Sequence, residues 1–195
     1  MVMNLSFLGG AGTVTGSKYA VEHDKHTLLI DCGLFQGFKV LRLRNWAPFP
    51  IEPRSISAVV LTHAHLDHSG YLPLLVKRGF RGSIFCSRAT ADLCEILLPD
   101  AGHLQEKDAE YANRHSFSKH KPALPLYTEE DARATLKRLT PIPFNEGRSL
   151  PDGGTIRLRR AGHILGAATV QLGWDDGSRR LTIGRRSGRY PGMAV

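Results

Sequence analysis

The chain has 195 residues, of which 42% are hydrophobic and 23% charged, a balance typical of folded globular proteins and not of disordered or fibrous ones. Its apolar stretches are far shorter than the roughly 20 residues of a membrane-spanning helix, and its first residues lack an export signal, so we expect no membrane association. Three cysteines without C-x-x-C spacing exclude a disulfide framework and a four-thiolate zinc site, and the cytoplasm is the expected compartment.

Positive charge is in excess along the chain and concentrated near its end. Lysine and arginine outnumber the acids by 26 to 18, which gives a net charge of +8. From Arg157 onward there are eight arginines and only two acids, Asp175 and Asp176. This excess suits an anionic partner such as nucleic acid, but solubility alone also explains it, so charge leaves both interpretations open.

The first third of the chain is predicted to begin with three consecutive strands. Alternating apolar residues indicate strands at residues 3–8, 18–22 and 27–31, with a glycine-rich turn at 9–16 between the first two. This turn superficially resembles a dinucleotide-binding fingerprint. That fingerprint requires a helix to begin in the loop, whereas here a second strand follows and the spacing is G-x-G-x-x-x-G. A nucleotide-binding Rossmann fold is therefore not expected.

The rest of the chain alternates predicted strands with a few helices. Strands are expected at residues 58–61, 83–86, 155–160, 168–174 and 180–183, and helices at 71–78, 89–98 and 128–139. The polar stretch 100–125 is expected to be irregular or loosely helical, and residues 175–178 form a hairpin turn signal. Without repeats or a linker, this order predicts one domain with an α/β or α+β sandwich and mixed β-sheets.

The most informative segment follows the buried strand predicted at residues 58–61. It contains His63, His65, Asp67 and His68, which are four potential metal ligands within six residues. Imidazole nitrogen and carboxylate oxygen are usual zinc ligands, and a loop leaving a strand lets the first two rings converge. Asp67 and His68 naturally aim elsewhere, so a second ion about 3.5–4 Å from the first would use the whole cluster. Simple packing is a poor alternative, because clustered imidazoles repel one another when protonated.

This H-x-H-x-D-H pattern at a strand end resembles the signature of the metallo-β-lactamase superfamily of metallohydrolases. Asp31, in Leu-Ile-Asp-Cys-Gly, resembles the first motif, an acid that supports the metal loop from behind. His163, in Ala-Gly-His-Ile-Leu-Gly-Ala, resembles the third motif, a remote histidine. The motifs at residues 12–17 and 35–37 add to this resemblance. In combination, the motifs are most similar to those of the β-CASP ribonucleases, the branch related to the cleavage and polyadenylation endonuclease.

The resemblance implies a four-layer αββα sandwich with a dinuclear zinc centre that hydrolyses RNA phosphodiester bonds. His63, His65 and His163 would hold one zinc, and Asp67 and His68 the other, with Asp67 also acting as the catalytic proton acceptor. The implied partner is RNA or another anionic phosphodiester, which nearby arginines would grip through its backbone. The oligomeric state stays open, a homodimer included.

Two parts of the β-CASP pattern are not found in these 195 residues. An aspartate that bridges the two zincs is expected on the strand returning from the hairpin, and alignment places Arg186 there, whose guanidinium cannot ligate zinc. A compensated frameshift over residues 184–189 is one hypothesis for this change. The β-CASP domain and a later histidine ligand are also absent. Residues 1–195 are thus expected to be the N-terminal part of a longer architecture, incomplete at the C-terminus and impaired in activity.

Three hypotheses follow for the function. The first is a zinc-dependent hydrolase of the ribonuclease type. The second is a degenerate module of the same fold that binds at most one zinc, and the third is a thioester or lactone hydrolase, which would still need the bridging acid. Two further groups of residues are not expected to take part in the chemistry. We expect His103, His115 and His120 to be solvated surface residues, and Cys32, Cys86 and Cys94 to be buried.

Overall fold

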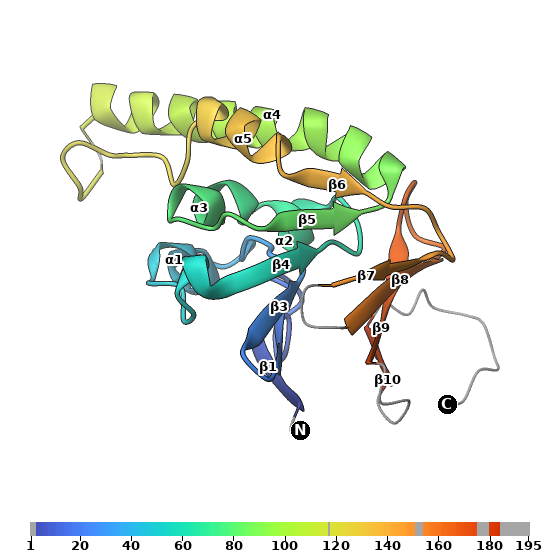
Figure 1. The fold of residues 1–195 in the computed structure, drawn as a ribbon. Helices are drawn as coiled ribbons and strands as arrows, with labels where there is room; N and C mark the ends of the chain where they lie inside the picture. Colours follow the sequence, from blue (N-terminus) through green and yellow to red (C-terminus); the bar gives the residue numbers. More distant parts are fainter. Residues whose placement is uncertain (1–2, 117, 151–153, 175–179, 184–195) are drawn as a thin grey trace.

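The structure is a computed structural model that describes residues 3–116, 118–150, 154–174 and 180–183 (Figure 1). Two β-sheets face each other, and the larger helices lie on the outer side of the first sheet (Figure 1). Among the described residues, no helix combines the length and apolar character that crossing a bilayer requires.

The first sheet has six strands in sequence order, β1-β2-β3-β4-β5-β6. Its strands are β1 (Met3–Gly9), β2 (Lys18–His23), β3 (His26–Ile30), β4 (Ile56–Val60), β5 (Ser83–Cys86) and β6 (Leu139–Pro141). The first three pair antiparallel, whereas β3 to β6 pair parallel, so the sheet is mixed. The carboxyl ends of β3, β4 and β5 therefore lie at one edge, where ligand sites commonly form.

The second sheet has four antiparallel strands in the order β10-β9-β8-β7. They are β7 (Gly147–Ser149), β8 (Gly154–Arg160), β9 (Ala168–Trp174) and β10 (Arg180–Ile183). Arg180 pairs with Gly173, which is the register of the hairpin expected from the turn signal. The turn itself lies outside the described residues.

Two apolar cores separate the layers. Leu28 and Ile30 of β3 point toward the second sheet, where they join Ile156 and Val170, and Leu29 points to the helices. Successive side chains of a strand alternate between the two faces, so a strand buried on both sides reads as a continuous apolar run. This is why the short apolar runs in the first sheet predicted their strands well.

The helical layer consists of α2 (Leu66–Ser69), α3 (Leu72–Lys77), α4 (Arg88–Arg114) and α5 (Glu129–Leu136), and α1 (Lys39–Leu43) lies apart from it with the 3-10 turns Arg44–Trp46 and Pro53–Ser55. Helix α5 begins with a capping box: the Thr128 hydroxyl accepts from the Asp131 backbone N–H, and the Asp131 carboxylate accepts from the Thr128 backbone N–H. The helix predicted at 128–139 ends early, because its last residue begins β6.

Of the two alternatives predicted for residues 100–125, the helical one is confirmed as far as Arg114, where α4 ends. Helix α4 continues through Pro99, which removes a backbone donor and normally ends a helix. Tertiary packing overrides that signal: Leu98, Ala101 and Gly102 are buried, and a Cβ on Gly102 would lie only 2.7 Å from the carbonyl oxygen of Thr128. The close approach of α4 to α5 thus stabilises the longer helix.

The predicted class of α and β elements with a mixed sheet is confirmed. The described residues supply three of the expected layers: helices, the mixed sheet and the antiparallel sheet (Figure 1). A helical layer outside the second sheet is not among the described residues. These three layers and their connections contain His63, His65, Asp67, His68 and His163.

Candidate metal centre

The candidate ligands gather at the edge where the parallel strands end. Asp31 directly follows β3, and the segment from Thr62 to His68 follows β4. His163 comes from the other sheet, in the connection between β8 and β9. The backbone N–H of Ala168, at the start of β9, donates to the carbonyl oxygen of Thr62 at 2.8 Å and so joins the two sheets beside the site.

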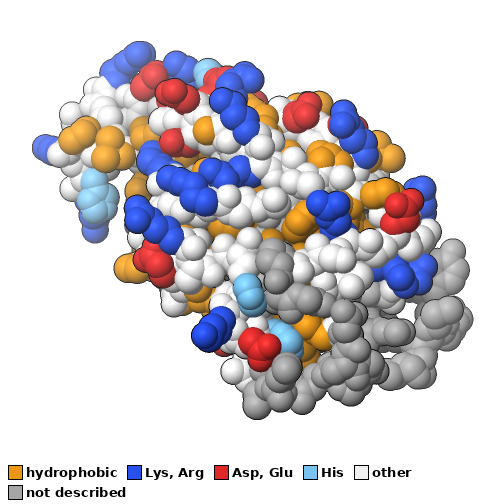
Figure 2. Space-filling view, in the orientation of Figure 1, with side chains coloured by type: hydrophobic (Ala, Val, Ile, Leu, Met, Phe, Trp, Pro, Cys, Tyr) orange, Lys and Arg blue, Asp and Glu red, His pale blue; other side chains and the backbone are white. Residues whose placement is uncertain are grey.

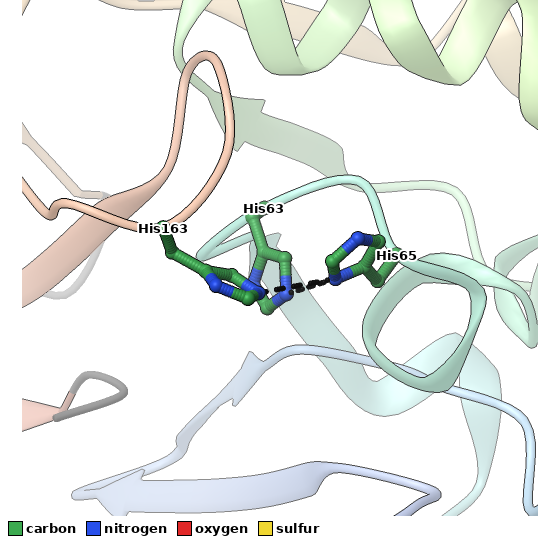
Figure 3. A group of neighbouring side chains, drawn as sticks. All are labelled: His63, His65 and His163. Carbon is green, nitrogen blue, oxygen red and sulfur yellow. Dashed lines mark hydrogen bonds between the residues drawn. The ribbon is translucent and has the colours of Figure 1, made fainter. Parts of the chain in front are cut away.

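Three imidazoles converge as the sequence predicts (Figure 3). The His65 Nδ1 atom lies 3.1 Å from His63 Nε2 and 3.2 Å from His163 Nε2, and all three ligand atoms lie within 4.8 Å of one another. His63 is only 1% exposed, whereas His163 is exposed. The cluster therefore reaches from the protein interior to its surface.

The spacing of these nitrogens fits a zinc ion. Zinc–nitrogen bonds of about 2.0–2.1 Å in tetrahedral geometry separate two nitrogens by about 3.3–3.4 Å, close to the two distances measured from His65 Nδ1. Hydrogen bonds alone suit the cluster poorly. The one N–H of a neutral imidazole at His65 Nδ1 could serve only one of the two nitrogens that face it. The donor set thus matches one shared cation.

Asp31 and Thr62 orient the buried rings. The Thr62 backbone N–H and hydroxyl both donate to the Asp31 carboxylate at 2.8 Å. The hydroxyl proton is thereby used, so its oxygen accepts from His63 Nδ1, which lies 2.9 Å away. This assignment places the His63 proton on Nδ1 and leaves Nε2 as the ligand atom facing His65.

Asp31 also fixes His68. His68 Nδ1 donates to the Asp31 carboxylate at 2.7 Å, which leaves His68 Nε2 as an acceptor on the opposite side of the ring, 3.6 Å from the Asp67 carboxylate. The His68 and His63 ring centroids are 4.0 Å apart. Asp67 and His68 therefore lie beside the triad, outside the three-histidine group but next to it. Their role as ligands of a second ion stays a prediction.

A turn after β3 supports the metal loop from below. The Cys32 backbone N–H donates to the His68 carbonyl oxygen at 2.7 Å, and that of Ser17 donates to the Asp67 carbonyl oxygen at 2.9 Å. A Cβ on Gly33 would lie 1.7 Å from the Asp67 carbonyl oxygen, so only glycine fits there. Asp31 itself has a left-handed φ of 56°, which turns its carboxylate into the loop.

Lys18, which the sequence placed only in a strand, is a buried cation behind this turn. It is 3% exposed, its ammonium donates to the Gly33 carbonyl oxygen, and it lies 4.4 Å and 4.8 Å from the Phe35 and Tyr71 ring centroids. Burial lowers the pKa of Lys18 from 10.5 to about 8, and the nearby Arg44 charge adds to this decrease. No residue pattern distinguished this lysine from an exposed strand residue.

We expect Lys18 to make stability depend on pH. Between about pH 8 and 10.5 the unfolded chain holds the Lys18 proton and the folded chain does not, so the folded state gains as pH rises. Relative to Lys18→Met, the wild-type free energy of unfolding should increase by up to about 3 kcal/mol across this range. Denaturant unfolding at pH 7.5, 9 and 10.5 measures it. Lys77→Met, at an exposed lysine, is the control. A difference in the free energy of unfolding between wild type and Lys18→Met that does not change with pH would contradict the lowered pKa of Lys18.

The histidines predicted at the surface and the cysteines predicted in the interior lie there. His103, His115 and His120 are exposed, and Cys32, Cys86 and Cys94 are fully buried, as expected. Burial raises the pKa of each thiol to about 12, so none is a ready thiolate. Arg186, the predicted replacement for the bridging acid, lies outside the described residues.

Comparison with known proteins agrees with this geometry. A profile described as "Metallo-beta-lactamase superfamily" matches residues 11–87, which include Asp31 and the cluster from His63 to His68. The chain therefore contains a metallo-beta-lactamase superfamily domain, and the resemblance drawn from its motifs, with the sandwich fold that it implies, is confirmed.

Two curated proteins are similar in sequence. "Ribonuclease TTHA0252" of Thermus thermophilus is 36% identical over 168 residues, which cover 86% of this chain and 34% of that protein. "Transcription termination factor FttA" of Methanocaldococcus jannaschii is 30% identical over 179 residues, which cover 92% of this chain and 26% of that protein. The chain thus spans about a third or less of these relatives' length.

A solved structure is similar in fold. BJP-1, a subclass B3 metallo-beta-lactamase of Bradyrhizobium japonicum, aligns with a TM-score of 0.52 over 93% of this chain and 58% of that chain. The sequence identity is 16%, so this likeness concerns the fold alone.

Proposed function

We propose that this chain is a zinc-dependent hydrolase domain of the β-CASP ribonuclease branch that cleaves phosphodiester bonds in RNA. The observation that carries the proposal is the convergence of three imidazole nitrogens from both sheets on one point. The names of its relatives, a ribonuclease and a transcription termination factor, support RNA as the substrate class. In this proposal residues 1–195 are one metallo-β-lactamase-like domain within a longer architecture.

In the proposed hydrolysis, the site residues bind metal and accept a proton. His63, His65 and His163 would hold one zinc, and Asp67 and His68 would contribute to a second. Bound zinc would lower the pKa of a water molecule and neutralise charge on the phosphate. The Asp67 carboxylate, 19% exposed, would serve as the proton acceptor.

Arginines next to the His163 connection could hold the substrate backbone. Arg159 and Arg160 end β8 immediately before this connection and are exposed. In Figure 2, basic side chains form several separate groups with acidic ones between them. The face shown there therefore has no continuous basic surface among the described residues. We therefore assign RNA contact to local arginines, which salt would screen.

A second candidate is a catalytically impaired module that holds one zinc. Arg186 in the sequence favours it, because the acid expected to bridge two zincs is replaced by a cation. The triad is complete without that position, whereas the pair of Asp67 and His68 is not a ligand set by itself. A thioester or lactone hydrolase would need the same missing acid and has no further support from the site.

Zinc content and RNA cleavage, measured together, test the proposal. Elemental analysis of the purified chain should give two zincs, and cleavage of a labelled single-stranded RNA should fall as salt rises from 50 to 300 mM. One zinc without cleavage would support the impaired module instead. Arg186→Asp, compared with the parent, should then raise the zinc content. Hydrolysis of a thioester or lactone alone would overturn RNA as the substrate.

A further inference from the structure

His163 is the ligand whose position most needs explanation. His63 is buried at the end of a core strand, but His163 is exposed on a connection between two strands of the other sheet. This connection, residues 161–167, is closed by backbone hydrogen bonds from Ala161 to Ala167 at 2.9 Å and from Ala167 to Ile164 at 3.0 Å. Those bonds shape the connection but do not by themselves place it against the first sheet.

Two buried hydroxyls of the helical layer attach the connection to the site. The Gly166 carbonyl oxygen accepts from the Ser87 hydroxyl at 2.7 Å and from the Thr90 hydroxyl at 3.0 Å. Ser87 is 1% exposed and Thr90 is 0% exposed. The Ser87 oxygen also accepts from the Thr90 backbone N–H at 3.2 Å, so it caps α4 at the same time.

The contact between Gly166 and the first turn of α4 leaves no space for a side chain at position 166. Gly166 has a left-handed φ of 79°, and a Cβ there would lie 2.5 Å from the Thr90 backbone nitrogen and 2.7 Å from the Ser87 hydroxyl oxygen. The connection is therefore pressed against the first turn of α4. Ser87 follows β5 just as the histidine loop follows β4, so one sheet edge supports both parts of the cluster.

We propose that Ser87 and Thr90 are positioning residues, which hold the 161–167 connection so that His163 Nε2 meets His63 and His65. This role rests on the proposed metal site. An exposed turn samples several arrangements, and two hydrogen bonds from buried hydroxyls to one carbonyl oxygen fix a single one before any ion arrives. Partners behind a metal ligand commonly change metal affinity by about 10–100-fold when they are removed.

Thr90→Val tests this role, because it removes the hydroxyl and keeps the shape of the side chain. Zinc affinity, measured by competition with a chelator, should fall about tenfold, and Thr90→Ser should restore it. Thr135→Val is the matched control. Thr135 is also 0% exposed, and its hydroxyl also donates to a backbone carbonyl oxygen, that of Asp131 at 2.9 Å, but within α5. The control should lose comparable stability and bind zinc like the wild type.

Amide hydrogen exchange of the zinc-free proteins provides a second readout. In Thr90→Val, exchange at Ala161 and Ala167 should be faster than in the wild type, while Thr135→Val leaves it unchanged. Equal zinc affinities and equal exchange in the two valine variants would overturn the positioning role. A wild-type protein that binds no zinc would instead overturn the proposed function, and the exchange comparison would still decide whether Thr90 anchors the connection.

Discussion

Asp31→Ala should lower the free energy of unfolding by about 3–5 kcal/mol and weaken zinc binding at least about tenfold. The carboxylate accepts from Ser17, Thr62 and His68, and the Thr62 donors are buried. Without it, a buried backbone N–H loses its acceptor, which costs about 1–3 kcal/mol by itself. Alanine also tolerates the left-handed φ of 56° poorly.

Asp24→Ala separates the backbone effect from the loss of the carboxylate. Asp24 has nearly the same left-handed φ, 52°, but it lies in the exposed turn between β2 and β3. Its replacement should cost the conformational part, about 1 kcal/mol, besides a 3.8 Å contact between its carboxylate and His23 Nδ1, and should leave zinc affinity unchanged. Denaturant unfolding and chelator competition measure both quantities. Equal losses in the two alanine variants would show that the Asp31 carboxylate supports nothing at the site.

Asp31→Asn tests the role of the Asp31 carboxylate through the position of the proton on His68. Asparagine accepts a left-handed φ, and its carbonyl oxygen can still serve the Thr62 backbone. Its amide group would then face His68 Nδ1 as a donor, which favours the tautomer with the proton on Nε2. This variant should keep most of its stability yet lose affinity for a second zinc. Nitrogen chemical shifts of His68 report the tautomer directly, and an unchanged proton position would refute this account.

The sequence was informative where one local pattern carries both structure and chemistry. The apolar run before His63 predicts a buried strand, and the ligands begin where that strand ends, so a short motif located the site. Asp31, at the end of the preceding strand, was found through its resemblance to the first motif of a known family. The resemblance to a known family supplied His163, because no local pattern joins it to a loop about 100 residues earlier.

What the sequence did not predict depends on contacts between distant segments. The burial of Lys18 is set by the rings of Phe35 and Tyr71, which meet it only in the folded chain. Helix α4 continues past Pro99 because α5 packs against it, although the local signal indicates an end. The hydrogen bond from the Ser87 hydroxyl to the Gly166 carbonyl oxygen joins positions 79 residues apart, and no local pattern indicates it.

His163→Ala should abolish most zinc binding while leaving the zinc-free fold intact. Because the side chain is exposed on a surface turn, its removal should change the free energy of unfolding by no more than about 0.5 kcal/mol. Zinc affinity should nevertheless fall at least about 100-fold, because one of three convergent nitrogens is lost. Few positions allow binding and stability to be separated this cleanly, since His63 is part of the core.

The melting temperature shows this separation. Zinc at 100 times its dissociation constant stabilises the wild-type fold by about 2.7 kcal/mol, which for a chain of this size raises the melting temperature by about 5–10 °C. At the same zinc concentration, His163→Ala would gain about 0.4 kcal/mol, a shift of about 1 °C. His103→Ala, at a half-exposed histidine of α4, should keep the full shift. If His163→Ala also kept it, the three rings would not share an ion, because an ion held by both sheets must lose affinity when the second sheet no longer contributes a ligand.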